Sequence, residues 1–248
     1  MIKQFCIFIL AMPLLFLSCD IVEGGGGDGP SSSSGKTESQ KNGIVTFYTT
    51  YNEDSVAYYT PELENGWYKC AVSENKLGEF PPQSAAKITY NDKTIYVLVT
   101  DLCPNDGNSH WTNNLNYFFD LAENAFAALE NKDKGHIDVS IQRIAYETNK
   151  NIKFAVKEGS NQWWLAGRFY NMRYPLAKVE YSSNGNTFKE MEKLDGNKNN
   201  WWEIKSGNDL FSNLQFRLTD VYGNTITCNA IKSLSVGRNY DLGKNFSY

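Results

Sequence analysis

Histidine and cysteine, two residue types that often hold metal ions, are scarce in this sequence. The 248 residues include two histidines, His110 and His136, and neither stands at metal-ligand spacing from Cys70, Cys103 or Cys228. We therefore expect neither a metal site nor any other cofactor. No internal repeat of about 20 to 50 residues is present either, so a repeat architecture is not expected.

Apolar residues form a long run only at the N-terminus. Residues 1–18 contain Lys3, an apolar run too short to span a membrane comfortably, and a small residue just before Cys19. This is the pattern of a secretory signal peptide. The triplet LSC also resembles the lipobox of bacterial lipoproteins, which are cleaved before the cysteine and carry lipid on its thiol. We expect an exported lipoprotein anchored to a membrane of the cell envelope through Cys19, with cleavage without lipid as the alternative.

After the signal, the chain divides into a tether and two halves of opposite charge. Residues 19–42 are rich in glycine and serine, which predicts a flexible tether. Residues 43–147 hold seven Lys/Arg against fifteen Asp/Glu, a net charge of −8, whereas residues 148–248 hold fourteen against nine, a net charge of +5. The contrast indicates two domains, the second attracted to an acidic partner such as an anionic wall polymer. A basic face that binds nothing is the alternative, and nucleic acid is not expected to meet an exported protein.

Strand patterns dominate both halves and predict a mainly β fold. In the first half, β-branched and aromatic runs cover residues 43–50, 85–90, 94–100 and 137–144, and Asn91 to Lys93 form a tight hairpin. One helix is expected over residues 122–132, with Asp120 upstream as a possible cap. In the second half, six short runs separated by Asn/Gly turns predict a β-sandwich: 151–159, 163–171, 177–183, 188–194, 214–220 and 224–231.

Two carboxylates stand near the ends of hydrophobic strands, Asp101 in VLVTDLCPND and Asp120 in FFDLAENAF. Carboxylates on a rigid sheet that face one groove can grip or cleave a sugar chain, one of them acting as an acid when its pKa is raised. The alternative is that Asp101 only forms a turn and Asp120 only caps a helix.

Aromatic residues make up 14% of the chain, more than its cores require. Some rings should therefore be exposed, and flat exposed rings suit stacking on sugars. The adjacent Trp163 and Trp164 in KEGSNQWW are the main candidates. Successive strand residues point to opposite faces, so presenting both indoles outward requires a loop or a bulge.

In this order, GIVTFY, VTDLCPN, FFDLAENAF, KEGSNQWW and RYPLAKVEY resemble the motifs of bacterial expansins, from residue 43 to about 235. The resemblance implies a six-stranded double-psi β-barrel over residues 43–147 and an immunoglobulin-like β-sandwich, a carbohydrate-binding module, over residues 148–248. Expansins are non-enzymatic proteins that bind cellulose-rich walls and loosen non-covalent contacts between polysaccharides. A monomer is expected.

Transferred by motif, the barrel groove comprises Thr46, Tyr48, Asp101 and Asp120. Asp120 matches the general acid of the related barrel endoglucanases and would be the indispensable residue.

The resemblance also implies that Trp163 and Trp164 form the aromatic platform with Lys157 beside it. This chain has Gly196 where many bacterial members have an aromatic residue, so Trp201 or Trp202 would supply a third ring.

Cysteine counting allows one disulfide at most. Cys6 leaves with the signal and Cys19 is lipidated, so Cys70, Cys103 and Cys228 remain. We expect a Cys70–Cys103 bridge because both lie in the same half of the chain. Cys103 also replaces a tyrosine of some bacterial expansins, as in plant-like members, which favours the same pairing.

Two other functions stay open. The same barrel occurs in endoglucanases and in lytic transglycosylases of peptidoglycan, where Asp120 would act as general acid. An inverting glycosidase needs a second carboxylate about 6.5 to 9.5 Å away, and Glu53 and Asp54 are the nearby candidates. Alternatively, the barrel is inert and the protein only binds. The sequence leaves cellulose, cellulose–hemicellulose junctions and peptidoglycan as possible targets.

The lipid anchor gives a direct test. A Cys19→Ser variant should leave the detergent phase in a detergent phase-partition experiment, because it lacks the thiol that carries the lipid. Identical partition of variant and parent would show that Cys19 is not lipidated.

Overall fold

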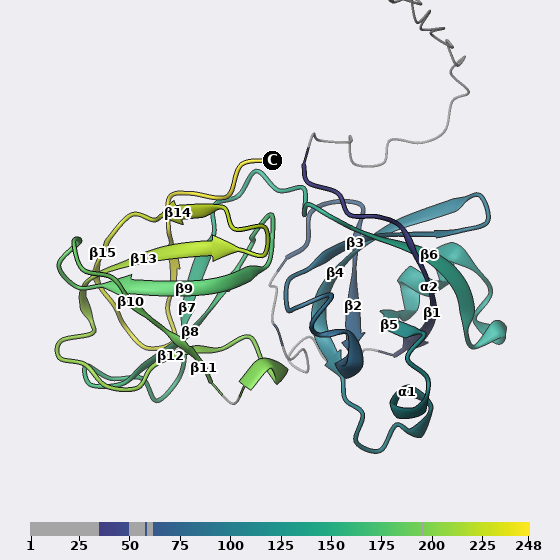
Figure 1. The fold of residues 1–248 in the computed structure, drawn as a ribbon, viewed down its shortest axis with the longest axis horizontal. Helices are drawn as coiled ribbons and strands as arrows, with labels where there is room; N and C mark the ends of the chain where they lie inside the picture. The colour runs from purple at the N-terminus through teal and green to yellow at the C-terminus, as the bar shows by residue number, and fades with distance from the viewer. Residues whose placement is uncertain (1–34, 50–57, 59–61, 195) are drawn as a thin grey trace, which may run out of the picture.

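The computed structural model describes the whole chain except residues 1–34, 50–57, 59–61 and 195. The described part forms two β-rich bodies side by side, and the expected mainly β fold is confirmed (Figure 1). In the described residues, no helix is both long and apolar enough to cross a membrane. The signal, Cys19, most of the tether, Glu53 and Asp54 lie outside the described residues.

The first body is a closed barrel of six strands in the order β1-β5-β2-β4-β3-β6. β1 is parallel to β5 and β2 is parallel to β4, and the other neighbours are antiparallel. The strands are β1 (Lys41–Tyr48), β2 (Trp67–Ser73), β3 (Ala85–Tyr90), β4 (Lys93–Cys103), β5 (Tyr117–Ala122) and β6 (Ile137–Ile144). Aliphatic and aromatic side chains such as Val45, Val72, Ile88 and Val97 fill its interior.

The predicted strands of the first half are confirmed. β3 and β6 have the predicted bounds, and Tyr90 pairs with Lys93 across a two-residue turn. Asn91 in this turn has a φ of 52°, a left-handed conformation that asparagine tolerates better than most residues. Central β2 was not predicted, because its sequence WYKCAVS does not alternate cleanly.

Short helices surround the barrel strands: η2 (Glu74–Lys76), α1 (Ser109–Asn113), α2 (Glu123–Leu129) and η3 (Lys132–Lys134). The predicted helix over 122–132 is therefore shorter than expected. Its N-cap is Ala122, and no side chain caps it. Asp120 lies within β5, so the alternative that this aspartate only caps the helix is wrong.

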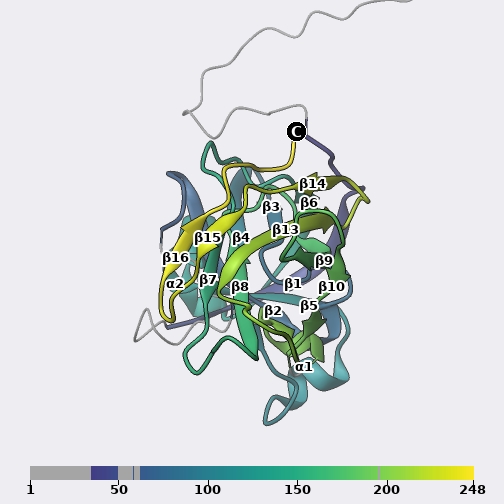
Figure 2. The same ribbon diagram turned by 90° about the vertical axis from the view of Figure 1, so that its left-hand side faces the viewer.

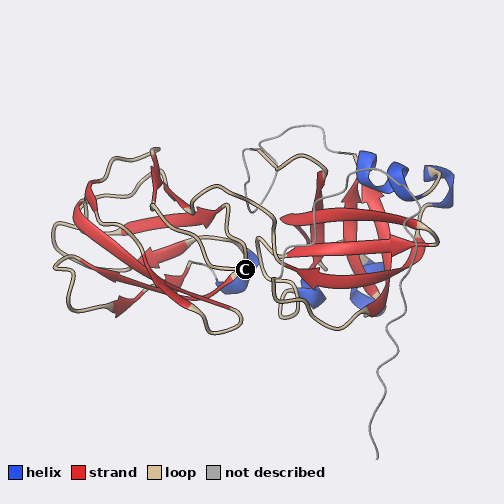
Figure 3. Cartoon of the chain, turned by 90° about the horizontal axis from the view of Figure 1, so that it is seen from above, coloured by secondary structure: helices blue, strands red, loops and turns tan. Residues whose placement is uncertain are grey.

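The second body, which we call the sandwich, consists of two five-stranded sheets. Figure 2 views it with the barrel behind, and Figure 3 shows its strands as a group separate from those of the barrel. One sheet contains β10 (Lys189–Glu190), β9 (Leu176–Ser182), β13 (Ser212–Asp220), β14 (Thr225–Thr227) and β15 (Ile231–Ser233). The other contains β11 (Glu192–Lys193), β12 (Trp202–Ile204), β8 (Leu165–Tyr170), β7 (Lys153–Val156) and β16 (Asn239–Asp241).

Aromatic rings join the two sheets. Phe216 of the first sheet lies 4.5 Å from Phe154 and 5.2 Å from Phe169 of the second, measured between ring centroids. All three rings are buried. Gly167 leaves room for this packing, since a Cβ there would lie 2.1 Å from Phe154.

The segment between the bodies is bonded to both of them. Tyr146 packs edge-on against Trp67 of the barrel, with ring centroids 4.8 Å apart, and its hydroxyl accepts a hydrogen bond from the Glu64 backbone N–H. The Thr148 hydroxyl donates to the Glu64 carboxylate at 2.7 Å, while the Arg173 guanidinium binds the Thr148 carbonyl. The linker is therefore held on both sides by polar contacts.

The expected Cys70–Cys103 disulfide is wrong. The three described cysteines are free and buried. In the parallel pairing of β2 with β4, Cys70 is opposite Val99 and Cys103 is opposite Ser73. Three residues of offset correspond to about 10 Å along a strand, whereas a disulfide needs Cα atoms about 4.4 to 6.8 Å apart.

Candidate carbohydrate-binding site

Four residues form a row across four neighbouring barrel strands. Asp101 of β4 is paired with Ala71 of β2, Ala71 with Asp120 of β5, and Asp120 with Thr46 of β1. Residues paired in this way point to the same face of a sheet. The structure thus brings together Thr46, Asp101 and Asp120, and the small Ala71 lies between the two carboxylates. We call this row the groove.

Two strand irregularities create the row. The pairing of β2 with β4 shifts between Cys70 and Ala71, which leaves Thr100 of β4 without an opposite residue. The pairing of β1 with β5 shifts between Ile44 and Val45, which does the same to Phe118. An extra residue reverses the facing of every residue beyond it, and bulges often redirect side chains at functional sites. Without the bulge at Thr100, Asp101 would face the barrel interior.

Asp120 is a strongly perturbed carboxylate of the groove. The Thr46 hydroxyl donates a 2.5 Å hydrogen bond to its Oδ1. Burial raises the pKa of Asp120 to about 6, and the negative charge of Asp101 adds to this, while the Thr46 hydrogen bond opposes it. A carboxyl group with this pKa is partly protonated in mildly acidic solution, so it can either donate or accept a hydrogen bond.

One end of the groove is lined by aromatic side chains. Tyr48, the fourth predicted groove residue, packs on a cluster of Ala71, Cys103 and Trp111, and Trp111 also contacts Tyr117 with 5.0 Å between ring centroids. Burial raises the pKa of Tyr48 well above its ordinary value. Trp111 was not predicted as a groove residue, because nothing near it in the sequence indicates that α1 folds back onto β2.

The adjacent indoles Trp163 and Trp164 lie in the loop before β8, as their outward presentation requires. The Asn161 side chain accepts hydrogen bonds from both backbone N–H groups, at 2.9 and 3.1 Å. Trp163 is 56% exposed, and Trp164 is half-buried. The Trp164 indole donates a 3.0 Å hydrogen bond to Glu203 of β12, which fixes the ring over the outer face of the sheet.

Trp201 is the third indole on this face of the sandwich. It precedes β12 and lies beneath two cations, with Lys157 Nζ 5.5 Å and Arg168 Cζ 4.5 Å from its ring centroid. Lys157 is hydrogen-bonded opposite Ala166, so it shares a face with Arg168 and Trp164. We call Trp163, Trp164, Trp201 and Lys157 the platform. Arg168 and Glu203 belong to the same face, although their sequence pattern did not mark them.

Trp202 does not belong to the platform. It is 4% exposed and is part of the sandwich core. Trp202 is the first residue of β12 and is paired with Gly167, so it faces the opposite way from Trp201 and Glu203.

The loop that carries Trp201 also contacts the barrel. Lys198 in η4 (Gly196–Lys198) forms a 2.5 Å ion pair with Glu74, which directly follows β2. Glu74 is three residues beyond Ala71, and it also accepts a hydrogen bond from the Asn105 backbone. The platform and the groove are therefore connected along one side of the protein.

The groove has the chemistry to grip a sugar chain. Asp101, Asp120 and Thr46 present hydrogen-bonding oxygens on one face, and the nearby rings offer apolar contact. Asp101 and Asp120 are separated by one intervening strand, or about 10 Å between backbones. Within the described residues, no group of three His, Cys, Asp or Glu side chains could hold a metal ion.

No protein-family model matches the chain. Expansin-YoaJ of Bacillus subtilis (strain 168) is 32% identical over 165 residues, which cover 66% of this chain and 61% of that protein. Expansin-like protein 1 of Dictyostelium discoideum is 22% identical over 263 residues, which cover 99% of this chain and 82% of that protein. The chain is similar to expansins. Its match spans about three fifths of the length of Expansin-YoaJ and about half of Expansin-like protein 6 of Dictyostelium discoideum.

The fold is also similar to that of a solved expansin structure. The crystal structure of Clavibacter michiganensis expansin superposes with a TM-score of 0.70 at 21% identity, covering 85% of this chain and 99% of that chain. A mutant of that expansin has been solved in complex with cellohexaose, with the same TM-score and coverage. The closed barrel and the additional sheets therefore match the fold of an expansin.

The raised pKa of Asp120 predicts a pH-dependent cost to stability. Between the ordinary value of 3.8 and about 6, the folded protein keeps a proton that the unfolded chain releases. Stability is therefore lost as the pH rises through this window, and Asp120→Asn should remove the loss. Relative to the parent, the variant should gain up to about 3 kcal/mol between pH 4 and pH 7 in urea unfolding.

Asp138→Asn is the matched control, since it removes an exposed carboxylate on β6 outside the groove. The difference in free energy of unfolding between Asp138→Asn and the parent should be the same at pH 4 and pH 7. If the difference between Asp120→Asn and parent is the same at both pH values, the carboxyl group is not desolvated.

Proposed function

We propose that this chain is a non-hydrolytic expansin-like protein that binds cellulose or related wall polysaccharides and loosens non-covalent contacts between them. The observation that carries the proposal is the groove of Thr46, Asp101 and Asp120 joined to the platform in a fold that matches an expansin. Similarity to expansins supports it, as does the cellohexaose complex of the Clavibacter protein.

The platform supplies most of the affinity. Exposed indole faces stack on the apolar C–H faces of a glucan, an arrangement insensitive to salt. Trp163 offers the largest exposed surface, while hydrogen bonding and cation contacts orient Trp164 and Trp201. Lys157 and Arg168 add positive charge at the edge of the stacking surface, which suits walls that also contain anionic polymer.

The groove supplies the loosening. A glucan chain that leaves the platform and enters the groove exchanges hydrogen bonds to its neighbours for bonds to Asp120, Asp101 and Thr46. The Lys198–Glu74 ion pair lies between the two surfaces and keeps them aligned. Such an exchange detaches a chain from its neighbours without breaking a covalent bond.

A second candidate function is a glycoside-cleaving enzyme, either an endoglucanase or a lytic transglycosylase of peptidoglycan. The raised pKa of Asp120 favours it, since a general acid must hold a proton near the working pH. Asp120 would protonate the leaving oxygen. The proposed bases Glu53 and Asp54 lie outside the described residues.

We also propose a two-domain organisation for this protein and its export to the cell envelope. Residues 43–147 form a double-psi β-barrel domain, and residues 148–248 form an immunoglobulin-like carbohydrate-binding module. Residues 1–18 are the signal of a monomeric, exported lipoprotein that reaches cellulose or peptidoglycan from the membrane. The tether expected over residues 19–42 ends earlier than predicted, because β1 begins at Lys41 and the Glu38 backbone N–H donates to the Arg143 carbonyl of the barrel. Support comes from the barrel topology, the two packed sheets and the LSC motif.

Replacing Trp163 and Trp164 together by alanine should weaken cellulose binding at least about tenfold. Each stacked ring contributes on the order of 1 kcal/mol, and about 1.4 kcal/mol corresponds to a factor of ten. Depletion isotherms on microcrystalline cellulose measure the effect. Leu115→Ala is the matched control, because it removes an exposed apolar side chain, 64% exposed, from the barrel. A folded double variant that binds like the parent would remove these rings from the binding surface.

Asp120→Asn separates the two candidate functions. Under the main proposal it abolishes wall loosening, measured as extension of heat-killed wall strips, and leaves cellulose binding nearly intact. The wild type should release no reducing ends from cellulose, xyloglucan or mixed-linkage glucan, with Asp138→Asn as the control for lost charge. Release of reducing sugar, or of anhydro-muropeptides from peptidoglycan, that disappears in Asp120→Asn would establish the enzyme instead.

A further inference from the structure

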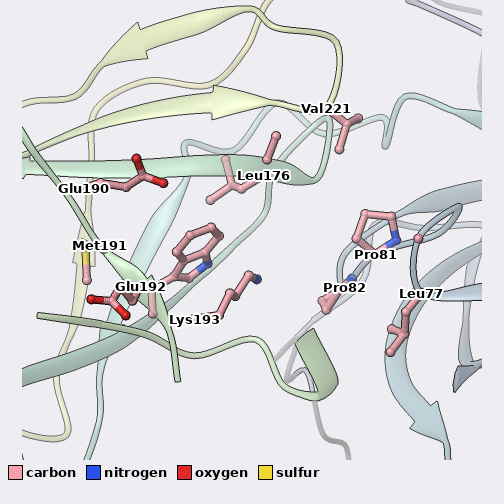
Figure 4. A pocket seen from close by; sticks show the side chains of 12 residues that line it. Leu77, Pro81, Pro82, Leu176, Glu190, Met191, Glu192, Lys193 and Val221 are labelled. Atoms are coloured by element: carbon pink, nitrogen blue, oxygen red, sulfur yellow. The ribbon is translucent and has the colours of Figure 1, made fainter. Parts of the chain in front are cut away.

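A cavity of about 620 Å³ lies between the barrel and the sandwich. Leu77, Pro81 and Pro82 line it from the barrel, and Leu176 and Val221 line it from the sandwich (Figure 4). No groove or platform residue lines it. Its volume falls in the range of about 300 to 1,000 Å³ that is typical of small-molecule sites.

Lys193 of β11 brings to this cavity a positive charge that no carboxylate of the described residues pairs with. It is half-buried, its Nζ lies 4.0 Å from the ring centroid of Trp202, and the described residues give it no ion pair. Figure 4 shows the Lys193 side chain reaching toward Pro82, with the carboxylate of Glu192 directed away from its nitrogen. Glu192 is already paired with Lys205 at 2.5 Å. Burial lowers the pKa of Lys193 to about 8, so the amine remains mostly charged at neutral pH.

A second hydrogen-bond donor of the cavity lining is also unsatisfied. Trp202 is 4% exposed, and its indole Nε1 is buried without an acceptor in the described part of the chain. Charges and polar groups removed from water are normally paired, because an unpaired one costs free energy. Two unmet donors on one cavity therefore favour a ligand that brings an anion.

The other residues that line the cavity indicate which further groups a ligand would carry. Pro81, Pro82 and Leu77 present an apolar surface that suits the C–H face of a sugar ring. Across the cavity, Glu190 is an exposed carboxylate that accepts hydrogen bonds from hydroxyl groups. One carboxylate, one apolar ring face and several hydroxyls together describe a sugar acid.

We propose that this cavity binds a hexuronic acid residue, with its carboxylate on Lys193 and its ring against the two prolines. The site is separate from the groove and the platform, so it does not rest on the proposed cellulose function. Because both bodies line it, a bound uronate holds the barrel and the sandwich together and stabilises the folded protein by mass action. This cavity would then recognise a uronic acid residue of a wall polymer by its ring shape and its charge. The net positive charge of residues 148–248 would attract the same polymer less specifically.

Titration of the wild type with D-galacturonate, followed by NMR or calorimetry, tests the proposal. We expect saturable binding of galacturonate and none of the neutral D-galactose. Lys193→Met should weaken galacturonate binding about tenfold or more, as expected for loss of a hydrogen bond to a charged group. Lys232→Met is the matched control, because Lys232 is an exposed lysine of β15 that does not line the cavity, and it should bind as the wild type does.

Gly78→Leu tests the cavity without changing any charge. Gly78 lines the cavity, a Cβ there meets no atom within 4 Å, and its backbone conformation is open to other residues. The leucine should occupy ligand space and reduce galacturonate binding, whereas Gly78→Ala should have little effect. Both variants should bind cellulose normally.

The proposal is overturned if galacturonate does not bind, or if Lys193→Met and Gly78→Leu, both folded, bind it like the parent. Galactose binding equal to that of galacturonate would exclude recognition of the carboxylate. Hexanoate binding as tight as galacturonate binding would exclude a sugar acid as the preferred ligand. None of these outcomes depends on Trp163 or Asp120, so this proposal and the proposed function can fail independently.

Discussion

The register between the strands of the barrel is the constraint on which the candidate site depends. Barrel closure fixes each strand between two neighbours, so the bulge at Thr100 cannot relax by sliding the strand. The bulge turns Asp101 to the face of Ala71 and Asp120, where two carboxylates share one poorly solvated surface. The raised pKa of Asp120 follows from that placement. A shift of one residue in β4 would move Asp101 inside and leave Asp120 without its charged neighbour.

Successive side chains of a strand point to opposite faces of the sheet, and this separates the tryptophans of the sandwich. Trp201 and Trp202 are adjacent in sequence, yet one lies beneath Arg168 on the surface and the other lies in the core. The buried ring of Trp202 anchors β12 to the core between the two sheets, and this places the Trp201 ring at a fixed height above the outer face of the sheet. Trp163 and Trp164 are not restricted to opposite faces, because hydrogen bonds to Asn161 hold their backbone in a loop and not in a strand. A rigid aromatic surface is thus built from one loop and one strand end.

Contacts between barrel and sandwich let two separate cores act as one binding protein. The Glu64 carboxylate is bonded to Thr148 in the linker, and Glu74 is paired with Lys198 beside the platform. Exposed ion pairs contribute little free energy, so these contacts set geometry more than stability. Between them the surfaces do not close completely, and the remaining cavity is lined by Lys193, which has no ion pair within the described residues. Orientation of the two bodies and ligand binding at their junction are therefore coupled.

Local sequence determined most of the strands, although not β2, and the hairpin at Asn91, because turn residues and short apolar runs act over a few neighbouring residues. It also marked the aromatic pair at Trp163 and Trp164 and the two carboxylates of the groove. Tertiary structure alone decided which way side chains face and which residues meet. It separated Cys70 from Cys103, buried Trp202, made Asp120 a partner of Thr46 instead of a helix cap, and placed Lys193 in a cavity. These outcomes depend on strand register and on contacts between segments far apart in the chain, for which no local pattern carries the information.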